Sequence, residues 1–314
     1  MSLSEISIQS ESGGRPRKEN YFWSNFSRKA TPYLFLSPFM LGFLVFLVYP
    51  LIYAFNLSLY RKQIIGGNTF VGLSNYVKAF QDASFWEGIR NVLVFGLLNI
   101  PIMLGLALLF ATLIDSGVIR RVSLFRLGFF LPFAVPNVVA ALIWGYFYGQ
   151  SFGPIAQLAN ALNLQPPMFL TAQGIIPSIA NISIWQYTGY NMLIIYAAMK
   201  AIPTELYEAA KVDGANEWQI AWNIRIPLVT PAILLTFIFS IIGTLQLFNE
   251  PSVLNTVAPT AMDRHFTPNL YVYNLAFANK QFDYSAAISF TLALVTAAVS
   301  SLVLFIIFRR EAKQ

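Results

Sequence analysis

The sequence predicts an all-α, polytopic membrane protein with six transmembrane helices. Hydrophobic residues make up 56% of the 314 residues and charged residues only 11%, whereas soluble domains are about one quarter charged. The polar side chains are too few to cover a soluble globule, so lipid must surround most of the chain. Apolar runs of about 20 residues, the length that crosses a bilayer as a helix, occur at 33–59, 91–113, 126–148, 175–199, 228–249 and 285–308.

The distribution of basic residues predicts how these spans are oriented. In an N-in, C-in arrangement, the cytoplasmic segments hold 14 of the 20 Lys and Arg residues, the excess that cytoplasmic loops usually carry. This bias also accounts for the net charge of +6, so nucleic acid is not an expected partner. We expect a cytoplasmic tail over 1–32, a transmembrane domain over 33–308 and a second cytoplasmic tail over 309–314.

The residues that would make this chain an enzyme are missing from the sequence. It contains no cysteine, a single histidine, and neither a phosphate-binding loop nor a zinc-protease motif. No Asp, Glu, Lys or Arg occurs from Leu127 to Met199 or between Leu228 and Asn249, although ion-coupled transporters usually carry such a residue inside the membrane. We therefore expect no catalytic residue, no metal site and no cofactor bound by this chain, and an energy source outside it.

A polar loop over 200–227 interrupts the apolar pattern on the cytoplasmic side. Pro203 and Thr204 open a short helix, and Gly214 allows a left-handed turn after it. Asn216 and Gln219 have the spacing of a capping box for a second helix, which we expect to stop before Pro227. The residues alone leave two interpretations open, a rigid knob in the cytoplasm or an amphipathic helix on the lipid surface.

The order of short motifs in this loop resembles a known family. "EAA" (208–210), "DGA" (213–215) and "IRIP" (224–227) look like the cytoplasmic loop of permease subunits of ATP-binding-cassette (ABC) importers. In that family the loop is the coupling helix, which docks on a separate ATPase subunit that binds ATP and Mg. The resemblance implies that the docking element consists of Glu208, Ala209, Ala210, Asp213, Gly214 and Ala215.

A second resemblance concerns the branch of that family. The segments 36–60, 131–153 and 182–210 are similar to sugar permease subunits of the maltose-transporter type, and the likeness covers most of 33–308. It implies the importer permease fold in the cytoplasmic membrane of a prokaryote. The implied partners are a second, homologous permease subunit, ATPase subunits, an extracytoplasmic solute-binding protein and membrane lipid.

The implied substrate is a disaccharide or a short oligosaccharide. With six spans and a short outside loop at 60–90, the chain departs from the maltose permease itself and looks more like the compact sugar permeases. The alternatives are an ABC permease for a non-sugar solute, and a secondary transporter or channel.

A sugar site needs hydroxyl and amide partners together with aromatic faces, and three spans supply them. In the fourth span Ser183, Tyr187, Tyr190 and Asn191 recur on one helical face. In the third span Phe133 and Asn137 lie one turn apart. The fifth span has a stripe of small and polar residues, for which helix packing is an equal alternative. The expected substrate-binding residues are Phe133, Asn137, Ser183, Gln186, Tyr187, Tyr190, Gly243, Thr244 and Gln246, and the resemblance supports the aromatic and amide members of this set.

Overall fold

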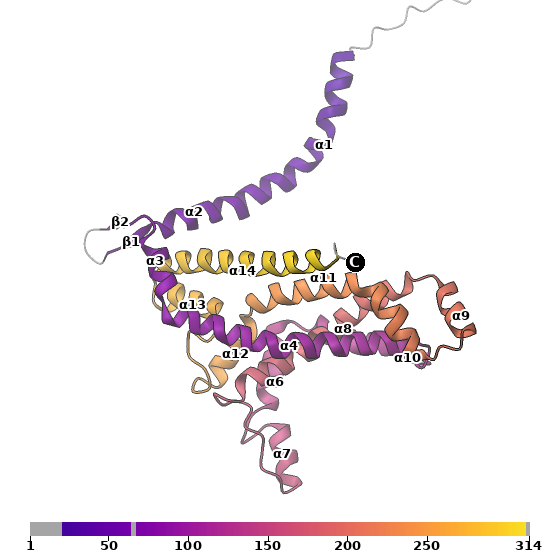
Figure 1. The fold of residues 1–314 in the computed structure, drawn as a ribbon. Coiled ribbons are helices and arrows are strands. Elements are labelled where there is room, and N and C mark those ends of the chain that lie inside the picture. Colours follow the sequence, from indigo (N-terminus) through magenta and orange to yellow (C-terminus); the bar gives the residue numbers. More distant parts are fainter. Residues whose placement is uncertain (1–20, 64–66, 312–314) are drawn as a thin grey trace, which may run out of the picture. The chain divides into compact units, whose positions relative to one another are not determined.

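The computed structural model describes residues 21–63 and 67–311, and it is mostly helical (Figure 1). The chain divides into two compact units, residues 1–54 and residues 55–314. The described part of the first unit contains α1 (Tyr21–Phe43), a π-helical turn (Leu44–Val48) and the start of α2 (Tyr49–Ser58). Most side chains from 31 to 54 are apolar and exposed, as a helix surrounded by lipid requires. Residues 1–20 of the expected N-terminal tail and residues 312–314 of the C-terminal tail lie outside the described residues.

The second unit is a helical bundle preceded by a short hairpin. Its hairpin consists of β1 (Tyr60–Lys62) and β2 (Asn68–Phe70), paired antiparallel. Its α-helices are α3 (Ser74–Gln81), α4 (Ala83–Asp115), α5 (Val122–Phe130), α6 (Asn137–Phe147), α7 (Pro154–Ala161), α8 (Ile175–Lys200), α9 (Thr204–Val212), α10 (Glu217–Ile220), α11 (Ile226–Leu245), α12 (Asn249–Val257), α13 (Pro268–Tyr273) and α14 (Phe282–Glu311). Shorter turns are 3-10 helical at Leu131–Ala134 and π-helical at Ala221–Arg225 and Asn274–Ala278.

Three helices form the centre of the second unit. The most extensive contact is between α4 and α8, and α11 packs against both (Figure 1). The side chains between these helices are aliphatic and small near the loop over 200–227, where Ala107, Ala111, Met192 and Ile195 are fully buried. Burying this apolar surface against neighbouring helices holds the centre together by close van der Waals contact.

Hydropathy along the sequence predicts six spans, and the structure supports part of this number. Within the described residues, four helices are long and apolar enough to cross a membrane, and five if one bent pair counts as a single span. The predicted span 126–148 is this pair: 122–134 and 137–147 meet at an angle of 96°, because Pro136 cannot continue the preceding helix. The predicted span 175–199 is helical as α8, but the polar side chains on it keep its hydropathy below that of the others.

The loop over 200–227 contains most of the local features predicted for it. Gly214 lies in the left-handed region, with φ of 81°, and Asn216 and Gln219 form a complete capping box at the start of α10. The prediction that the second helix stops before Pro227 was wrong. After α10 the chain makes one π-helical turn and continues directly into α11, where Pro227 lies in the first turn. The proline is tolerated because the π-helical turn before it shifts the backbone hydrogen-bond pattern of this continuous helix.

Asp82 fixes the opposite end of α4. As the N-cap residue it accepts hydrogen bonds from the backbone N–H groups of Ser84 and Phe85. The hydroxyl groups of Tyr271 and Tyr284 also donate to it, at 2.8 and 2.6 Å. Burial alone would raise the pKa of the Asp82 carboxyl, but these four hydrogen bonds outweigh it and lower the pKa. This single carboxylate therefore ties α4 to α13 and α14.

A close approach of two segments occurs at Gly189 in the middle of α8. A Cβ atom built there would lie 1.7 Å from the carbonyl oxygen of Phe129 in α5. We predict that Gly189→Ala lowers the stability of the chain by about 1 to 3 kcal/mol or more, because no rotamer change can move a backbone carbonyl away. Thermal unfolding and the yield of folded protein in detergent measure this effect.

Gly105 in α4 is the matched control, because a Cβ built there meets no atom within 4 Å. Gly105→Ala should leave the yield unchanged or raise it, since alanine is the better helix former. Equal yields for the two variants would contradict the close contact.

Candidate functional site

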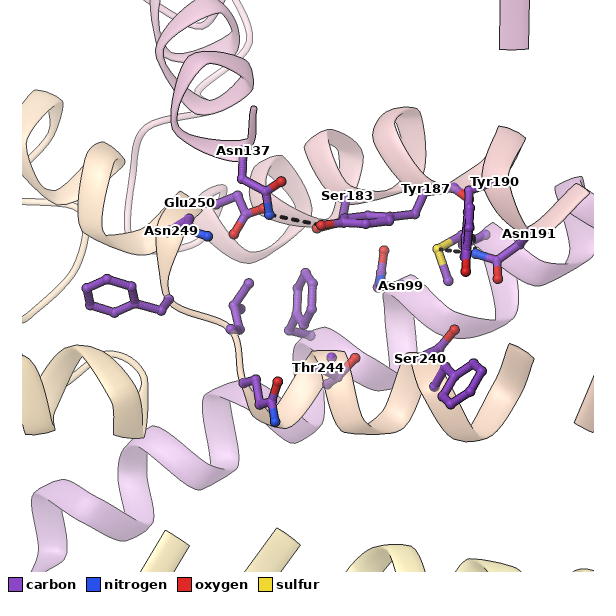
Figure 2. A pocket seen from close by; sticks show the side chains of 17 residues that line it. Asn99, Asn137, Ser183, Tyr187, Tyr190, Asn191, Ser240, Thr244, Asn249 and Glu250 are labelled. Atoms are coloured by element: carbon purple, nitrogen blue, oxygen red, sulfur yellow. Dashed lines mark hydrogen bonds between the residues drawn. The ribbon is translucent and has the colours of Figure 1, made fainter. Parts of the chain in front are cut away.

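A cavity of about 240 Å³ opens between the central helices (Figure 2). Side chains from α4, α8 and α11 line it, together with the first residue of α6 and the segment that follows α11. The lining residues are Phe95, Asn99, Met103, Asn137, Ser183, Tyr187, Tyr190, Asn191, Phe239, Ser240, Gly243, Thr244, Gln246, Leu247, Phe248, Asn249 and Glu250. Aromatic rings, amides and hydroxyl groups thus meet in one concave site, the arrangement typical of small-molecule pockets.

One face of α8 supplies the polar wall of this cavity. Ser183, Tyr187, Tyr190 and Asn191 all line it, as their helical spacing predicts. Asn191 donates its side-chain N–H back to the carbonyl of Tyr187 at 3.0 Å. Among the described residues, no hydrogen bond occupies the Asn191 oxygen or the Tyr190 hydroxyl, so this face presents polar atoms to the cavity (Figure 2).

The break in the third predicted span brings Asn137 to the cavity. Asn137 is the first residue of α6, and its Nδ2 donates to the hydroxyl of Tyr187 at 2.9 Å (Figure 2). Gln186 does not line the cavity. It is only 1% exposed, and its Nε2 donates to the carbonyl of Val135 at 2.7 Å and to Oδ1 of Asn137 at 3.1 Å. Gln186 therefore holds the break in place and orients Asn137.

Phe133 is also placed behind the cavity wall. Its ring stacks on that of Tyr190, with centroids 4.5 Å apart and planes 15° apart, and meets Tyr187 edge to face at 5.9 Å. Stacked and edge-to-face pairs of this kind fix the orientation of the rings. Phe133 thus sets the ring plane that Tyr190 offers to a ligand.

Gly243 and Thr244 of α11 line the cavity, and so does Gln246, the residue that follows this helix. Gly243 has no atom within 4 Å of the position that a Cβ would take, so the backbone of α11 is open to the cavity there. Thr244 packs against Gly96 of α4, with its methyl carbon 2.8 Å from a Cβ built on that glycine. This threonine combines helix packing with a place in the lining.

Two polar residues of the lining were not predicted from the sequence. Asn99 in α4 is 5% exposed, and its Oδ1 has no hydrogen-bond partner among the described residues. Glu250 at the start of α12 is 3% exposed. Asn99 is one amide in a long apolar run, and Glu250 follows the end of a span, so neither has a periodic partner that would mark it.

The candidate docking residues form a separate, exposed feature. Glu208, Ala209, Asp213 and Gly214 are exposed, and Ala210 and Ala215 are half-buried. They lie on α9 and on the turn between α9 and α10, next to Val212, which is 87% exposed. Trp218 and Trp222 follow, 69% and 54% exposed, with ring centroids 5.7 Å apart. A surface with this much exposed apolar area is typical of a binding site for another protein or for lipid.

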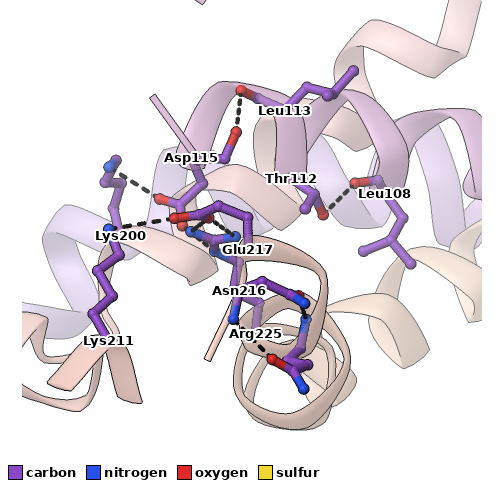
Figure 3. A network of polar contacts seen from close by, with 11 residues as sticks. Leu108, Thr112, Leu113, Asp115, Lys200, Lys211, Asn216, Glu217 and Arg225 are labelled. Carbon is purple, nitrogen blue, oxygen red and sulfur yellow. Dashed lines mark hydrogen bonds and ion pairs between the residues drawn. The ribbon is translucent and has the colours of Figure 1, made fainter. Parts of the chain in front are cut away.

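A network of ion pairs joins this loop to the central helices (Figure 3). Asp115 ends α4, and its carboxylate pairs with Arg225 at 2.8 Å and with Lys200 of α8 at 3.0 Å. Arg225 also donates from two nitrogens to Glu217 of α10, both at 3.0 Å. Lys211 of α9 pairs with Glu217 at 3.3 Å.

The centre of this network is buried and its edge is exposed. The side chains of Arg225 and Asp115 are only 4% and 2% exposed, whereas those of Lys211 and Glu217 are 59% and 44% exposed. Tyr207 of α9 lies under the Arg225 guanidinium, 5.1 Å from ring centroid to Cζ. Burial raises the pKa of the Tyr207 hydroxyl, and the nearby Asp115 charge raises it further. The loop is therefore held to α4, α8 and α11 by buried charges.

Comparisons with known proteins agree with this arrangement. Residues 104–312 match the family described as the inner membrane component of binding-protein-dependent transport systems. The chain is similar to the lactose transport system permease protein LacF of Rhizobium radiobacter, 33% identical over 86% of this chain and 91% of that protein. It is also similar to the arabinooligosaccharides transport system permease protein AraP of Bacillus subtilis, 31% identical over 88% of each chain.

A solved structure shares the fold. A chain of the bacterial alginate ABC transporter, in complex with an alginate pentasaccharide-bound periplasmic protein, superposes with a TM-score of 0.76. The identity is 24%, and the alignment covers 90% of this chain and 95% of the other. The family match covers more than half of the chain, and its relatives are permease proteins of transport systems. The chain is therefore a multi-pass component of the cytoplasmic membrane rather than an enzyme, and it belongs to the family of inner membrane components of binding-protein-dependent transport systems.

Proposed function

We propose that this chain is the permease subunit of an ABC importer that moves a sugar, a disaccharide or a short oligosaccharide, through the cavity between α4, α8 and α11. The observation that carries this proposal is the cavity lining, which combines amides, hydroxyl groups and aromatic rings. Sugar rings present hydroxyl groups at their edges and apolar faces, and such a lining suits both. The lactose and arabinooligosaccharide permeases among its relatives support a sugar as the substrate.

We propose further that the chain crosses the membrane six times with both ends in the cytoplasm. In this topology α8 and the bent pair 122–147 each count as a span. A helix of low hydropathy can still cross the membrane when its polar face is buried among other helices. The excess of basic residues on one side supports this orientation. The loop with α9 and α10 then faces the cytoplasm.

The partners follow from an open cavity and an exposed loop. A second, homologous permease subunit would supply the opposite wall, and an extracytoplasmic binding protein would deliver the sugar. An ATPase subunit, which binds ATP and Mg, would dock on Glu208, Asp213, Gly214 and the adjoining alanines. Exposed polar and small residues on a rigid turn support this docking.

We infer that the buried ion pairs transmit the movement of the docked loop. Asp115 and Arg225 join the loop to the ends of three central helices, and a buried ion pair holds its geometry because separating the charges leaves each one unpaired.

The direct test of the proposed function is uptake of labelled sugars by the assembled complex in proteoliposomes. Gly243→Leu should fill the cavity from its open wall and reduce uptake by about tenfold or more, equivalent to a loss of about 1.4 kcal/mol of binding. Gly105→Leu is the matched control, because Gly105 has equally open surroundings but does not line the cavity. Normal uptake by the Gly243 variant, or uptake of a non-sugar solute alone, would contradict the proposal.

A second experiment tests the docking loop. Gly214→Pro should abolish transport and release the ATPase, because proline cannot adopt the positive φ of this turn. Glu208→Ala and Asp213→Lys should weaken both transport and the docking of the ATPase. Co-purification of the ATPase with the tagged permease measures docking. Gly72 also has a positive φ, but it lies beside the hairpin, so Gly72→Pro should keep the ATPase bound. Retention of a fully active ATPase by all three loop variants would refute the docking role.

The third prediction concerns the ion-pair network. Arg225→Met should destabilise the chain by about 3 to 5 kcal/mol, because it leaves the buried Asp115 without its closest partner. Lys211→Met removes an exposed pair and should have little effect on stability. Thermal unfolding of both variants in detergent provides the comparison, and a similar melting temperature for the two would show that the buried pair adds no stability.

A further inference from the structure

Glu250 places a carboxyl group in the wall of the cavity. Its side chain is 3% exposed and is part of the lining. Figure 2 shows it beside Asn137, next to the hydrogen bond that Asn137 donates to Tyr187. Within the part of the chain that the structure describes, its own backbone N–H is the one hydrogen-bond donor to this carboxyl. A carboxyl group with most of its acceptor sites open therefore borders the cavity.

No basic side chain among the described lining residues compensates this group. Among the described lining residues Glu250 is the only acidic or basic one. The sequence contains no Lys or Arg between Arg126 and Lys200, and none between Arg225 and Arg264. The walls from α6, α8, α11 and α12 therefore contribute no positive charge, and the potential in the cavity is negative whenever the Glu250 carboxyl is ionised.

We propose that Glu250 makes this site selective by charge: it accepts hydrogen bonds from the hydroxyl groups of a neutral saccharide and disfavours anionic saccharides such as uronates and sugar phosphates. This inference rests on the proposed sugar-import function and specifies its substrate class. Hydroxyl donors match a carboxylate acceptor. An anion would meet a like charge in a poorly solvated site, and could lie beside Glu250 only if the carboxyl first took up a proton.

A purely structural role for Glu250 makes a different prediction. The residue lies in the first turn of α12, where a carboxylate is favourable at the positive helix end. If that were its whole role, replacing it would change the binding of neutral and anionic sugars by the same factor. The ratio between the two affinities therefore separates the two roles.

The test uses the complex of both permease subunits and the ATPase in nanodiscs. The binding protein is left out, so that only the site within the membrane determines which sugar binds. The probes are maltose, cellobiose and galactobiose, each paired with its uronate, in which carboxylate replaces CH₂OH at C6. For a pair that binds, we expect the neutral sugar to bind at least about tenfold more tightly than its uronate, as a like-charge contact implies. Glu250→Gln should bring the two affinities within about threefold, because the shape is kept and the charge is removed.

Two further variants make the test independent of how well Glu250→Gln folds. Glu250→Asp keeps the charge and should keep the discrimination. Gln246→Lys introduces a cation at another lining position and should narrow the ratio as well. Thermal unfolding of each complex shows that the variants compared are folded.

The outcomes separate the two proposals. Equal binding of sugar and uronate by the wild-type complex, or a ratio that Glu250→Gln and Gln246→Lys both leave unchanged, overturns the charge selectivity and leaves sugar import standing. If the complex binds none of the three pairs of sugars and the complete importer takes up a non-sugar solute, the sugar function is overturned, and the inference with it.

Discussion

The hydrogen bond from Gln186 to the carbonyl of Val135 is the interaction on which the site depends. The chain turns by 96° between the two halves of the third predicted span, and a break of this kind leaves backbone groups without helical partners. In lipid such groups must be satisfied by the protein itself. Gln186 is buried in α8 and supplies this donor at 2.7 Å, while the same nitrogen contacts Asn137. The break can therefore exist at this depth, and Asn137 reaches the cavity because of it.

The same constraint explains where charge is placed. The walls of the cavity are neutral except for Glu250, and the other charged groups of the central helices lie at their ends. Charged side chains are costly within the bilayer, and the lining that α4, α8 and α11 supply consists largely of amides, hydroxyl groups and aromatic rings. Apart from Glu250, the described lining residues include no acidic or basic side chain that could relay protons or ions along a gradient. This agrees with membership of a family whose transport depends on separate proteins.

Much of this arrangement is predictable from the sequence, and the exceptions have physical reasons. The spacing of Ser183, Tyr187, Tyr190 and Asn191 predicts one polar face, because helix geometry is local, and all four line the cavity. The capping box at Asn216 and the glycine turn at Gly214 are local for the same reason.

Features that depend on contacts between distant segments could not be predicted in this way. Gln186 lies one residue from the polar face, and only the position of Val135 shows that it points to the break rather than to the cavity. Glu250 follows the end of a span, and nothing in the local pattern shows that the chain turns back to the cavity there. Pro227 was expected to end a helix, yet the π-helical turn before it lets the helix continue into α11. The count of spans depends on the mean hydropathy of each helix. The polar face of α8 lowers its mean hydropathy, so hydropathy alone does not identify this helix as a span.

The positions of the cavity and of the ion pairs on the same three helices suggest how movement of the loop reaches the solute. Each of α4, α8 and α11 contributes side chains to the cavity and has one end in the ion-pair network, at Asp115, Lys200 and Arg225. A packed helix moves as a rigid body, because its backbone hydrogen bonds and close-packed side chains resist bending. A displacement of the loop therefore cannot be absorbed at the ends of the helices that it contacts. It must appear at the cavity as a shift of the walls relative to one another, and the open backbone at Gly243 leaves room for such a shift.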